Sequence, residues 1–179
     1  VDGFTSEYMV NITIPDAELL IDGAAYTSGT DYYTVGLHYL RIVGENGYEA
    51  EYTFTLTERV NGLVNGQEYS SLKLNCENIE SMQLNGVAVS NLTEVNLVGN
   101  YTLVVSGTNG YTSEYNFTIG LNLKNVENEG VYNSAIAPIA NAETIYLNGV
   151  PFTSGETVSN VGYHSMRIEG VGGYVHEIS

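Results

Sequence analysis

The chain has 179 residues, of which 21 are acidic and 5 are basic, and its formal net charge is −16 at pH 7. So few Lys and Arg residues argue against nucleic acid and anionic membrane surfaces as partners, because both are bound through clustered positive charge. Apolar residues make up 43% of the chain, which excludes a disordered protein, and no apolar stretch is long enough for membrane insertion.

A period of 63 residues runs through the whole sequence and aligns three copies without a gap between the matched columns. The columns identical in all three copies are Gly23/Gly86/Gly149, Val35/Val98/Val161, Gly36/Gly99/Gly162, Gly44/Gly107/Gly170, Gly47/Gly110/Gly173, Tyr48/Tyr111/Tyr174 and Glu51/Glu114/Glu177. Such constant spacing is typical of an array of similar modules. It predicts domains at residues 1–62, 63–125 and 126–179, with the last strand of the third domain truncated.

Each copy begins with a strand, expected at residues 9–14, 72–76 and 135–139. A second strand is expected at residues 17–21, 80–84 and 143–147. Asp-Gly or Asn-Gly follows each of these second strands, which indicates a two-residue hairpin loop of type I′ with positive φ at both positions. The other glycines are also interpreted as turn residues with positive φ.

A short strand near residues 31–34 precedes a second, longer hairpin in each copy. In the first copy, His38, Leu40 and Ile42 lie on one face of a strand. Residues 44–47 form the turn, and Tyr52, Phe54 and Leu56 form the matching face of the return strand. About six short strands per copy predict an all-β fold, either a small antiparallel sandwich or a partly open barrel.

One family resemblance follows from this order of motifs. Residues 143–155 read Glu-Thr-Ile-Tyr-Leu-Asn-Gly-Val-Pro-Phe-Thr-Ser-Gly, and Val161-Gly162, an aromatic-rich strand and a Gly-rich turn come after them. This order resembles the bacterial immunoglobulin-like tandem repeats of Gram-positive cell-surface proteins and adhesins, and the likeness covers all three copies. The resemblance implies three tandem immunoglobulin-like β-sandwich domains in a secreted or cell-wall-attached protein, where they space or present another domain.

The acidic column Glu51/Glu114/Glu177, which is identical in all three copies, is a candidate for either a metal site or cross-strand ion pairs. Hairpin pairing would place Arg41 opposite Glu51 and Arg167 opposite Glu177, which explains the column through surface ion pairs. In the middle copy the position opposite Glu114 is apolar. We expect no metal site, because no Asp-rich loop repeats in the chain.

Neither His nor Cys indicates catalysis. His38 and His164 share a column with Tyr101, and a catalytic His would not alternate with Tyr along a repeat, so this column is expected to pack with a polar tip at the sandwich rim. Cys76 cannot form an intrachain disulfide, because it is the single cysteine, and is expected to be a buried small hydrophobe. No nucleophile elbow or phosphate-binding loop is present, so we expect no catalytic residue and no cofactor.

The 15 tyrosines raise the question of sugar binding by aromatic rings. Tyr48, Tyr111 and Tyr174 lie beside a turn, where many related repeats carry a polar residue, and are the candidate binding residues. The alternative interpretation is that these tyrosines pack against their own turns.

The sequence therefore favours a non-catalytic extracellular array that serves as a stalk, spacer or adhesive surface. A carbohydrate- or protein-binding accessory module of a secreted enzyme is the alternative, and a host or cell-wall glycan or protein is the expected partner. Residues 177–179 align with residues 114–116, so the third copy stops before its counterpart of residues 117–119. We expect this end to self-associate or to be covered by a neighbouring chain.

Overall fold

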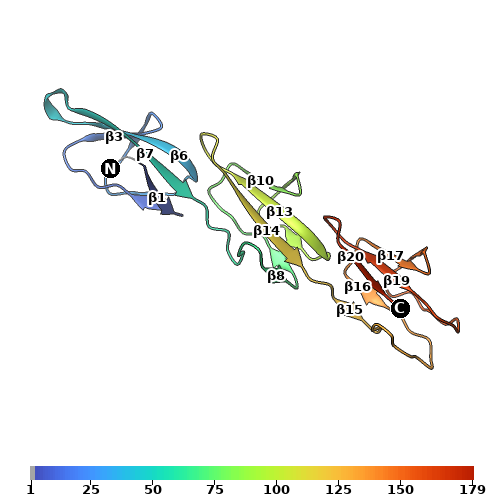
Figure 1. Cartoon of the computed structure of the whole chain (residues 1–179). Helices are drawn as coiled ribbons and strands as arrows, with labels where there is room; N and C mark the ends of the chain where they lie inside the picture. Colours follow the sequence, from blue (N-terminus) through green and yellow to red (C-terminus); the bar gives the residue numbers. More distant parts are fainter. Residues whose placement is uncertain (1–2) are drawn as a thin grey trace. The chain divides into compact units, whose positions relative to one another are not determined.

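The structure is a computed structural model that describes residues 3–179. These residues form β-strands, with one 3-10 turn at Glu45–Gly47 and no α-helix (Figure 1). The predicted all-β class is confirmed. Among the same residues, no helix has the length and apolar character needed to cross a membrane.

The chain divides into two compact units, each made of three segments. The first unit holds the residues up to Asn61, Asn75–Leu92 and Leu103–Glu114. The second unit holds Gly62–Leu74, Thr93–Thr102 and Tyr115–Ser179. The division into three domains at 1–62, 63–125 and 126–179 stays a prediction.

The first copy of the repeat is a two-layered sandwich. Its main sheet contains, in spatial order, β1 (Phe4–Glu7), β7 (Glu49–Thr57), β6 (Gly36–Val43), β3 (Glu18–Ile21) and β4 (Ala24–Tyr26). The second layer pairs β2 (Val10–Asn11) with β5 (Asp31–Tyr32). The predicted second strand and both hairpins are confirmed here, and the barrel alternative is not.

The first strand of this sheet was not expected from the sequence. β1 pairs with β7 in parallel, with Phe4 opposite Phe54, whereas the other pairs of this copy are antiparallel. Phe4 stacks on Phe54 with ring centroids 5.2 Å apart. A strand of four residues gives a weak alternation signal, and its parallel partner lies about fifty residues away, so local patterns do not indicate the pair.

Residues 68–119 repeat the same strand order. Their main sheet contains β11 (Val87–Val89), β10 (Ser81–Leu84), β13 (Gly99–Ser106), β14 (Thr112–Ile119) and β8 (Glu68–Tyr69), and β8 is again the parallel strand. The accompanying two-stranded layer pairs β9 (Leu72–Lys73) with β12 (Glu94–Val95).

The third copy has a four-stranded sheet in the order β18 (Val150–Phe152), β17 (Thr144–Leu147), β19 (Met166–Glu169) and β20 (Val175–Ile178). β15 (Leu123–Lys124) pairs with β16 (Ile139–Ala140) beside it. β19 has four residues, whereas its counterparts β6 and β13 have eight. The shorter β19 follows from the shorter partner strand β20.

All three short hairpins have the predicted turn geometry. Their two central residues have positive φ, at +50° and +81° for Asp22 and Gly23 in the first copy. The Asn85-Gly86 and Asn148-Gly149 turns have φ of +48° and +78°, and of +50° and +79°. This local chemistry alone sets the register of each hairpin.

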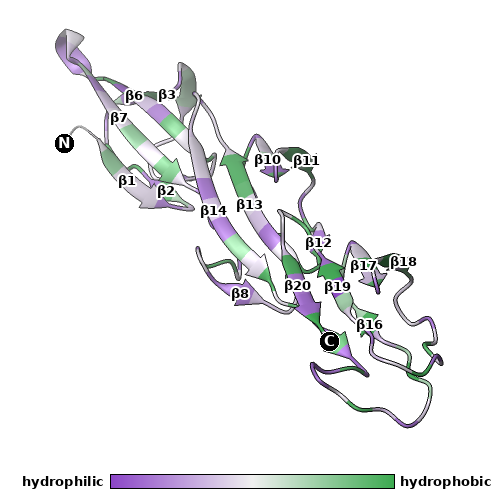
Figure 2. Cartoon of the chain, turned by 45° about the vertical axis from the view of Figure 1, so that its right-hand side comes forward, coloured by the Kyte–Doolittle hydropathy of each residue, from purple (hydrophilic) through white to green (hydrophobic). Residues whose placement is uncertain are grey.

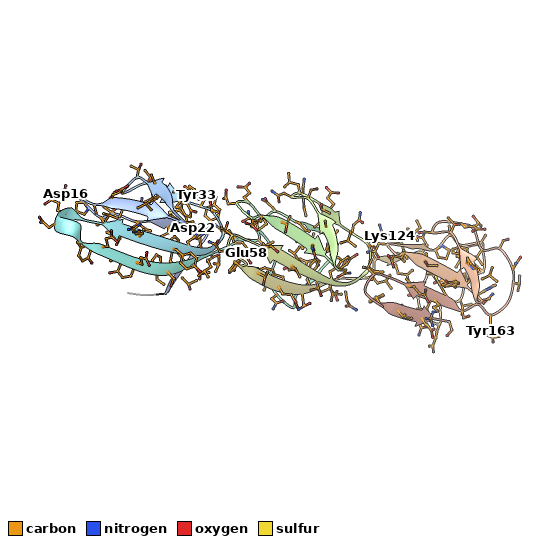
Figure 3. All side chains as sticks on the ribbon, turned by 90° about the horizontal axis from the view of Figure 1, so that it is seen from above. Asp16, Asp22, Tyr33, Glu58, Lys124 and Tyr163 are labelled. Atoms are coloured by element: carbon orange, nitrogen blue, oxygen red, sulfur yellow. The ribbon has the colours of Figure 1, made fainter. Side chains whose placement is uncertain are left out.

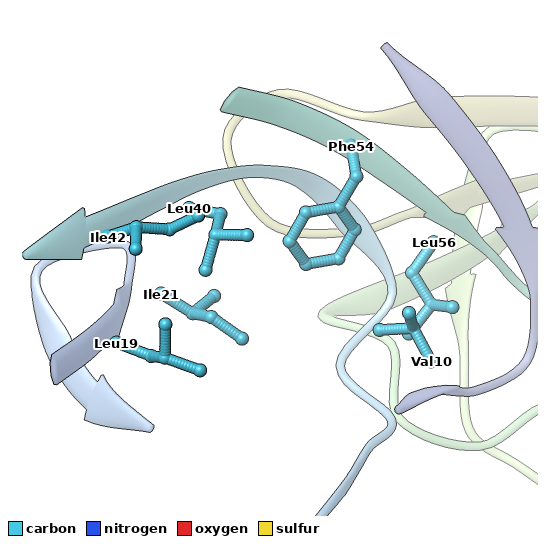
Figure 4. Close-up of a cluster of buried hydrophobic side chains, with 7 residues drawn as sticks. All are labelled: Val10, Leu19, Ile21, Leu40, Ile42, Phe54 and Leu56. Atoms are coloured by element: carbon cyan, nitrogen blue, oxygen red, sulfur yellow. The ribbon is translucent and has the colours of Figure 1, made fainter. Parts of the chain in front are cut away.

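The cores lie on the faces that alternation predicts. Hydrophobic and hydrophilic residues alternate along β7, β13 and β14 (Figure 2). In the first copy the buried cluster consists of Val10, Leu19, Ile21, Leu40, Ile42, Phe54 and Leu56 (Figure 4). In the second unit another cluster consists of Val98, Ile145, Met166, Ile168 and Ile178. By the period, Val98 belongs to the middle copy, yet it packs with side chains of the third copy.

Candidate functional site

In the first unit, the turn at residues 107–111 packs against the start of β6. Thr108 N donates a hydrogen bond to Val35 O over 2.8 Å, and Leu37 N donates one to Thr108 O over 3.2 Å. Together these bonds make a short parallel bridge outside the named strands. We call this contact joint 1.

Two glycines permit joint 1, because a side chain at either position would collide with the opposite backbone. A Cβ on Gly36 would lie 2.6 Å from both Thr108 N and Thr108 O. A Cβ on Gly107 would lie 2.5 Å from Val35 O. Gly36 also has a φ of +150°, which side chains disfavour.

The second unit contains the same contact one period later, which we call joint 2. Val171 N donates to Val98 O over 2.9 Å, and Asn100 N donates to Val171 O over 3.0 Å. A Cβ on Gly99 would collide with the backbone of Val171, and a Cβ on Gly170 would collide with Val98 O. Two successive copies of the repeat therefore use the same residue columns to build the same joint.

These contacts correct the interpretation of every glycine column as a turn requirement. Gly44, Gly107 and Gly170 do not have positive φ. The close approach of two backbones explains the glycines at 107 and 170, and it also explains why Val35 and Val98 are buried to 1% and 0% exposure. The close approach joins segments about seventy residues apart, which a turn-based reading of the sequence does not consider.

A polar network borders joint 1. Asn109 Nδ2 donates to Leu37 O over 2.7 Å and to Asp22 Oδ1 over 3.2 Å. The second carboxylate oxygen of Asp22 lies 2.7 Å from His38 Nδ1, and His38 Nε2 lies 2.7 Å from Thr34 O. His38 is fully buried. Its role is to satisfy backbone and carboxylate groups at the edge of the core.

The column that contains His38 confirms the expected packing at the rim. Tyr101 Oη donates to Leu97 O over 2.9 Å, and His164 Nε2 lies 3.0 Å from Asn160 O. Leu97 and Asn160 are the counterparts of Thr34. His and Tyr are exchangeable here because either side chain reaches the same carbonyl from a mostly apolar position.

A buried carboxylate also lies in the first unit. Glu58 is 4% exposed and accepts hydrogen bonds from Tyr111 Oη over 2.8 Å and from Ser113 Oγ. Burial and the hydrogen bond to Glu58 raise the pKa of Tyr111 to about 12. Glu58 was not expected from the sequence, because it lies in a connecting segment and its counterpart one period later is Leu121. The one available signal was an acidic residue in an otherwise apolar position.

Cys76 is buried in the same unit, as expected. Burial and the negative charges of Glu58 and Glu77 raise the pKa of the Cys76 thiol to about 11. A thiol of this kind stays protonated at neutral pH and is a poor nucleophile.

The three candidate tyrosines have different environments. Tyr48 is 57% exposed. Tyr111 is half-buried against Glu58, and half-buried Tyr174 packs on the cluster that contains Val98. Burial and the charge of Glu68 raise the pKa of Tyr174. Tyr48 therefore offers the most accessible ring of this column.

The predicted strand register around the acidic column is confirmed, with Arg41 opposite Glu51 and Arg167 opposite Glu177. Arg167 Nη1 contacts Glu177 Oε1 at 3.1 Å, as expected. The predicted ion pair between Arg41 and Glu51 was wrong, because Arg41 Nη2 contacts Glu49 Oε2 at 2.9 Å instead. Within residues 3–179, no group of three or more His, Cys, Asp or Glu side chains is arranged to hold a metal ion.

We expect Tyr111 to make stability depend on pH in the alkaline range. Folding raises its pKa from 10.0 to about 12, so the folded state favours the protonated phenol. The resulting stabilisation is complete below pH 10 and is lost as the pH rises through about 12. Urea unfolding should show a steeper loss across this range in the native chain than in Tyr111→Phe. Equal pH slopes for the two chains would contradict the assignment.

No protein-family model matches the chain, and no curated protein matches it. Solved structures that share a weak likeness with it include the following three. The first is SGBP-B of the Bacteroides ovatus mixed-linkage glucan utilization locus, in complex with a mixed-linkage heptasaccharide, at 13% identity, 97% coverage of this chain, 60% coverage of that chain and a TM-score of 0.23. The chain therefore spans about 60% of the length of that structure.

The other two structures are multidomain fragments, one of them of immunoglobulin domains. Sidekick-1 immunoglobulin domains 1–4 match at 11% identity, with 99% of this chain and 72% of that chain covered and a TM-score of 0.23. Extracellular domains 3–5 of Drosophila OTK match at 10% identity, with 98% and 92% covered and a TM-score of 0.21. TM-scores in this range support no conclusion about function.

Proposed function

We propose that this chain is a non-catalytic array of tandem immunoglobulin-like β-sandwich modules that serves as a stalk or spacer in an extracellular bacterial surface protein. The observation that carries this proposal is the repetition of one joint from the same columns. Successive copies are linked by backbone hydrogen bonds and closely packed glycines, so the sequence is specialised for holding neighbouring modules together.

The polar side chains of the described residues also favour a structural role. His38 and Glu58 satisfy buried hydrogen-bonding groups, and Arg41 and Arg167 form surface ion pairs. Each of these arrangements has a structural explanation. The acidic surface would keep such an array soluble and separated from similar chains.

A binding module for carbohydrate is the second candidate, because the second unit has a suitable groove. It has a volume of about 510 Å³, and Tyr146, Arg167, Glu169 and Glu177 contribute to its wall. An aromatic ring beside charged and polar groups suits the faces and hydroxyl groups of a sugar. Exposed Tyr48 is a further aromatic contact of the same kind, located in the first unit.

A glycan array probed with the whole chain distinguishes the two candidates. For a spacer we expect no glycan to be retained above the level of a Tyr146→Ala, Tyr48→Ala double variant. Tyr48 is exposed and Tyr146 is half-buried, so the double variant serves as the matched control once its melting temperature equals that of the native chain. Retention of one glycan class that is lost in the double variant would overturn the spacer proposal in favour of the binding module.

A further inference from the structure

Each joint has a receiving half and an inserting half. The receiving half is the Val-Gly pair before the long strand, which is Val35-Gly36 in joint 1 and Val98-Gly99 in joint 2. The inserting half is the five-residue turn that begins with Gly, at 107–111 and 170–174. By the period, residues 161–162 form a third receiving half, and residues 44–48 form a third inserting half.

The third receiving half is exposed. The relative exposure of Val161 is 104%, compared with 1% for Val35 and 0% for Val98. No atom lies within 4 Å of a Cβ built on Gly162. Tyr163, which follows it, has a relative exposure of 106%. It is labelled in Figure 3. A valine that is buried in both joints is thus fully accessible here.

The glycine of the third receiving half nevertheless has nearly the same φ as its two counterparts. Gly162 has a φ of +144°, close to +150° for Gly36 and +155° for Gly99. Beside it, Asn148 Oδ1 accepts a hydrogen bond from Ser165 N over 2.9 Å, as Asp22 Oδ1 accepts one from Tyr39 N over 3.0 Å. The glycine and the neighbouring turn are therefore in place, although residues 162–165 lie in no strand, unlike their counterparts in β6 and β13.

The third inserting half is formed in advance. Gly44 N donates to Tyr48 O over 2.9 Å, and the equivalent bonds measure 3.0 Å in the turn at 107–111 and 2.9 Å in the turn at 170–174. Asn46 has a φ of +60°, compared with +57° for Asn109. Since the inserting half is already ordered, its docking loses little of its own conformational entropy.

We propose that residues 161–163 bind the turn at residues 44–48 of a second copy of this chain and so form an end-to-end joint. By the period, Glu45 N of one molecule would donate a hydrogen bond to Val161 O of the second molecule. Tyr163 N of the second molecule would donate one to Glu45 O of the first. The Asn46 amide would reach Tyr163 O and Asn148 Oδ1, as the Asn109 amide reaches Leu37 O and Asp22 Oδ1.

A second molecule of this chain is the partner that the chain itself specifies. The two joints show that this receiving surface accepts a turn that begins with Gly and has residues with positive φ at its third and fourth positions, and residues 44–48 provide such a turn. The two surfaces are unlike, so the contact is head-to-tail and extends into linear assemblies. The net charge of −16 on each molecule of the chain opposes this contact, so salt should strengthen the association.

Sedimentation velocity of the whole chain tests the proposal. From about 50 μM to about 2 mM in about 0.5 M salt, we expect the weight-average mass to rise steadily beyond that of a dimer. Amide chemical shifts measured over the same range should change mainly at residues 44–48 and 161–163. A mass that stays monomeric, or shift changes elsewhere on the surface, would overturn the proposal.

Gly44→Ala separates docking from folding. Gly44 has a φ of −100°, which suits alanine, and the nearest atom to its Cβ would be Tyr48 Cδ1 at 3.3 Å. In a docked joint the same methyl group would meet the Val161 carbonyl, as a Cβ on Gly107 meets Val35 O at 2.5 Å. We expect an unchanged melting temperature and at least about a tenfold weaker self-association. Val87→Ala, at an exposed apolar residue outside both halves, is the matched control and should associate normally.

A mixture of two variants provides the decisive result. Gly44→Ala keeps its receiving half, and Gly162→Ala keeps its inserting half, so each alone should be monomeric. Mixed together they should form dimers and no longer assemblies. Failure of the mixture to restore association would overturn the head-to-tail assignment. If Gly162→Ala unfolds the third copy, the retained association of Gly44→Ala with the native chain gives the same readout, and its absence overturns the proposal.

Discussion

Replacing Gly107 by Ala should lower the free energy of unfolding by about 1–3 kcal/mol, because the added methyl group overpacks joint 1. Its Cβ would lie 2.5 Å from Val35 O, and backbone atoms cannot move away without breaking the bridging hydrogen bonds. The same change at Gly44, in the same column, should leave stability unchanged or raise it by about 0.5 kcal/mol. Both positions lack positive φ, so the difference isolates the joint.

Urea unfolding of the two variants and of the native chain measures this difference directly. Gly170→Ala should behave like Gly107→Ala, because its Cβ would collide with Val98 O in joint 2. If Gly44→Ala were as destabilising as Gly107→Ala, a local backbone preference would explain the column. The joints would then contribute little to the stability of the array.

Replacing Glu58 by Ala should cost about 2–4 kcal/mol, since two donors in a poorly hydrated region lose their acceptor. Tyr111 Oη and Ser113 Oγ both donate to this carboxylate, which is 4% exposed. Removing a charged acceptor while its donors remain is more damaging than removing the whole set. Tyr111→Phe alone should cost less, because Ser113 still donates to Glu58.

The second unit suggests the control for this experiment, because Leu121, one period after Glu58, packs there against the cluster that contains Val98. The combination Glu58→Leu, Tyr111→Phe and Ser113→Ala should recover most of the stability lost in Glu58→Ala. Urea unfolding of the single and combined variants gives the coupling energy of the network. Additive losses, with no recovery in the combination, would show that the carboxylate stabilises the unit through other contacts.

The repeat, the hairpins and the core faces could be predicted from the sequence because each depends on local chemistry. Asp22-Gly23 and the two Asn-Gly pairs adopt positive φ wherever they occur, and strand alternation assigns Leu40 and Phe54 to the interior without knowledge of the partner. The constant period then extends one interpretation to three copies.

The joints were decided by the tertiary structure alone. In the sequence, Gly107 resembles any other glycine near a turn. Only the folded structure shows that a side chain is excluded there, because Val35 O, 72 positions away in the sequence, packs against it. Glu58 resembles a connector residue until Tyr111 and Ser113 bury it. Arg41 could reach two carboxylates on one strand face, and side-chain geometry selected Glu49 over Glu51. Local patterns determine how each copy folds, whereas contacts between distant segments determine how copies join, because those contacts depend on shape and close approach and not on residue periodicity.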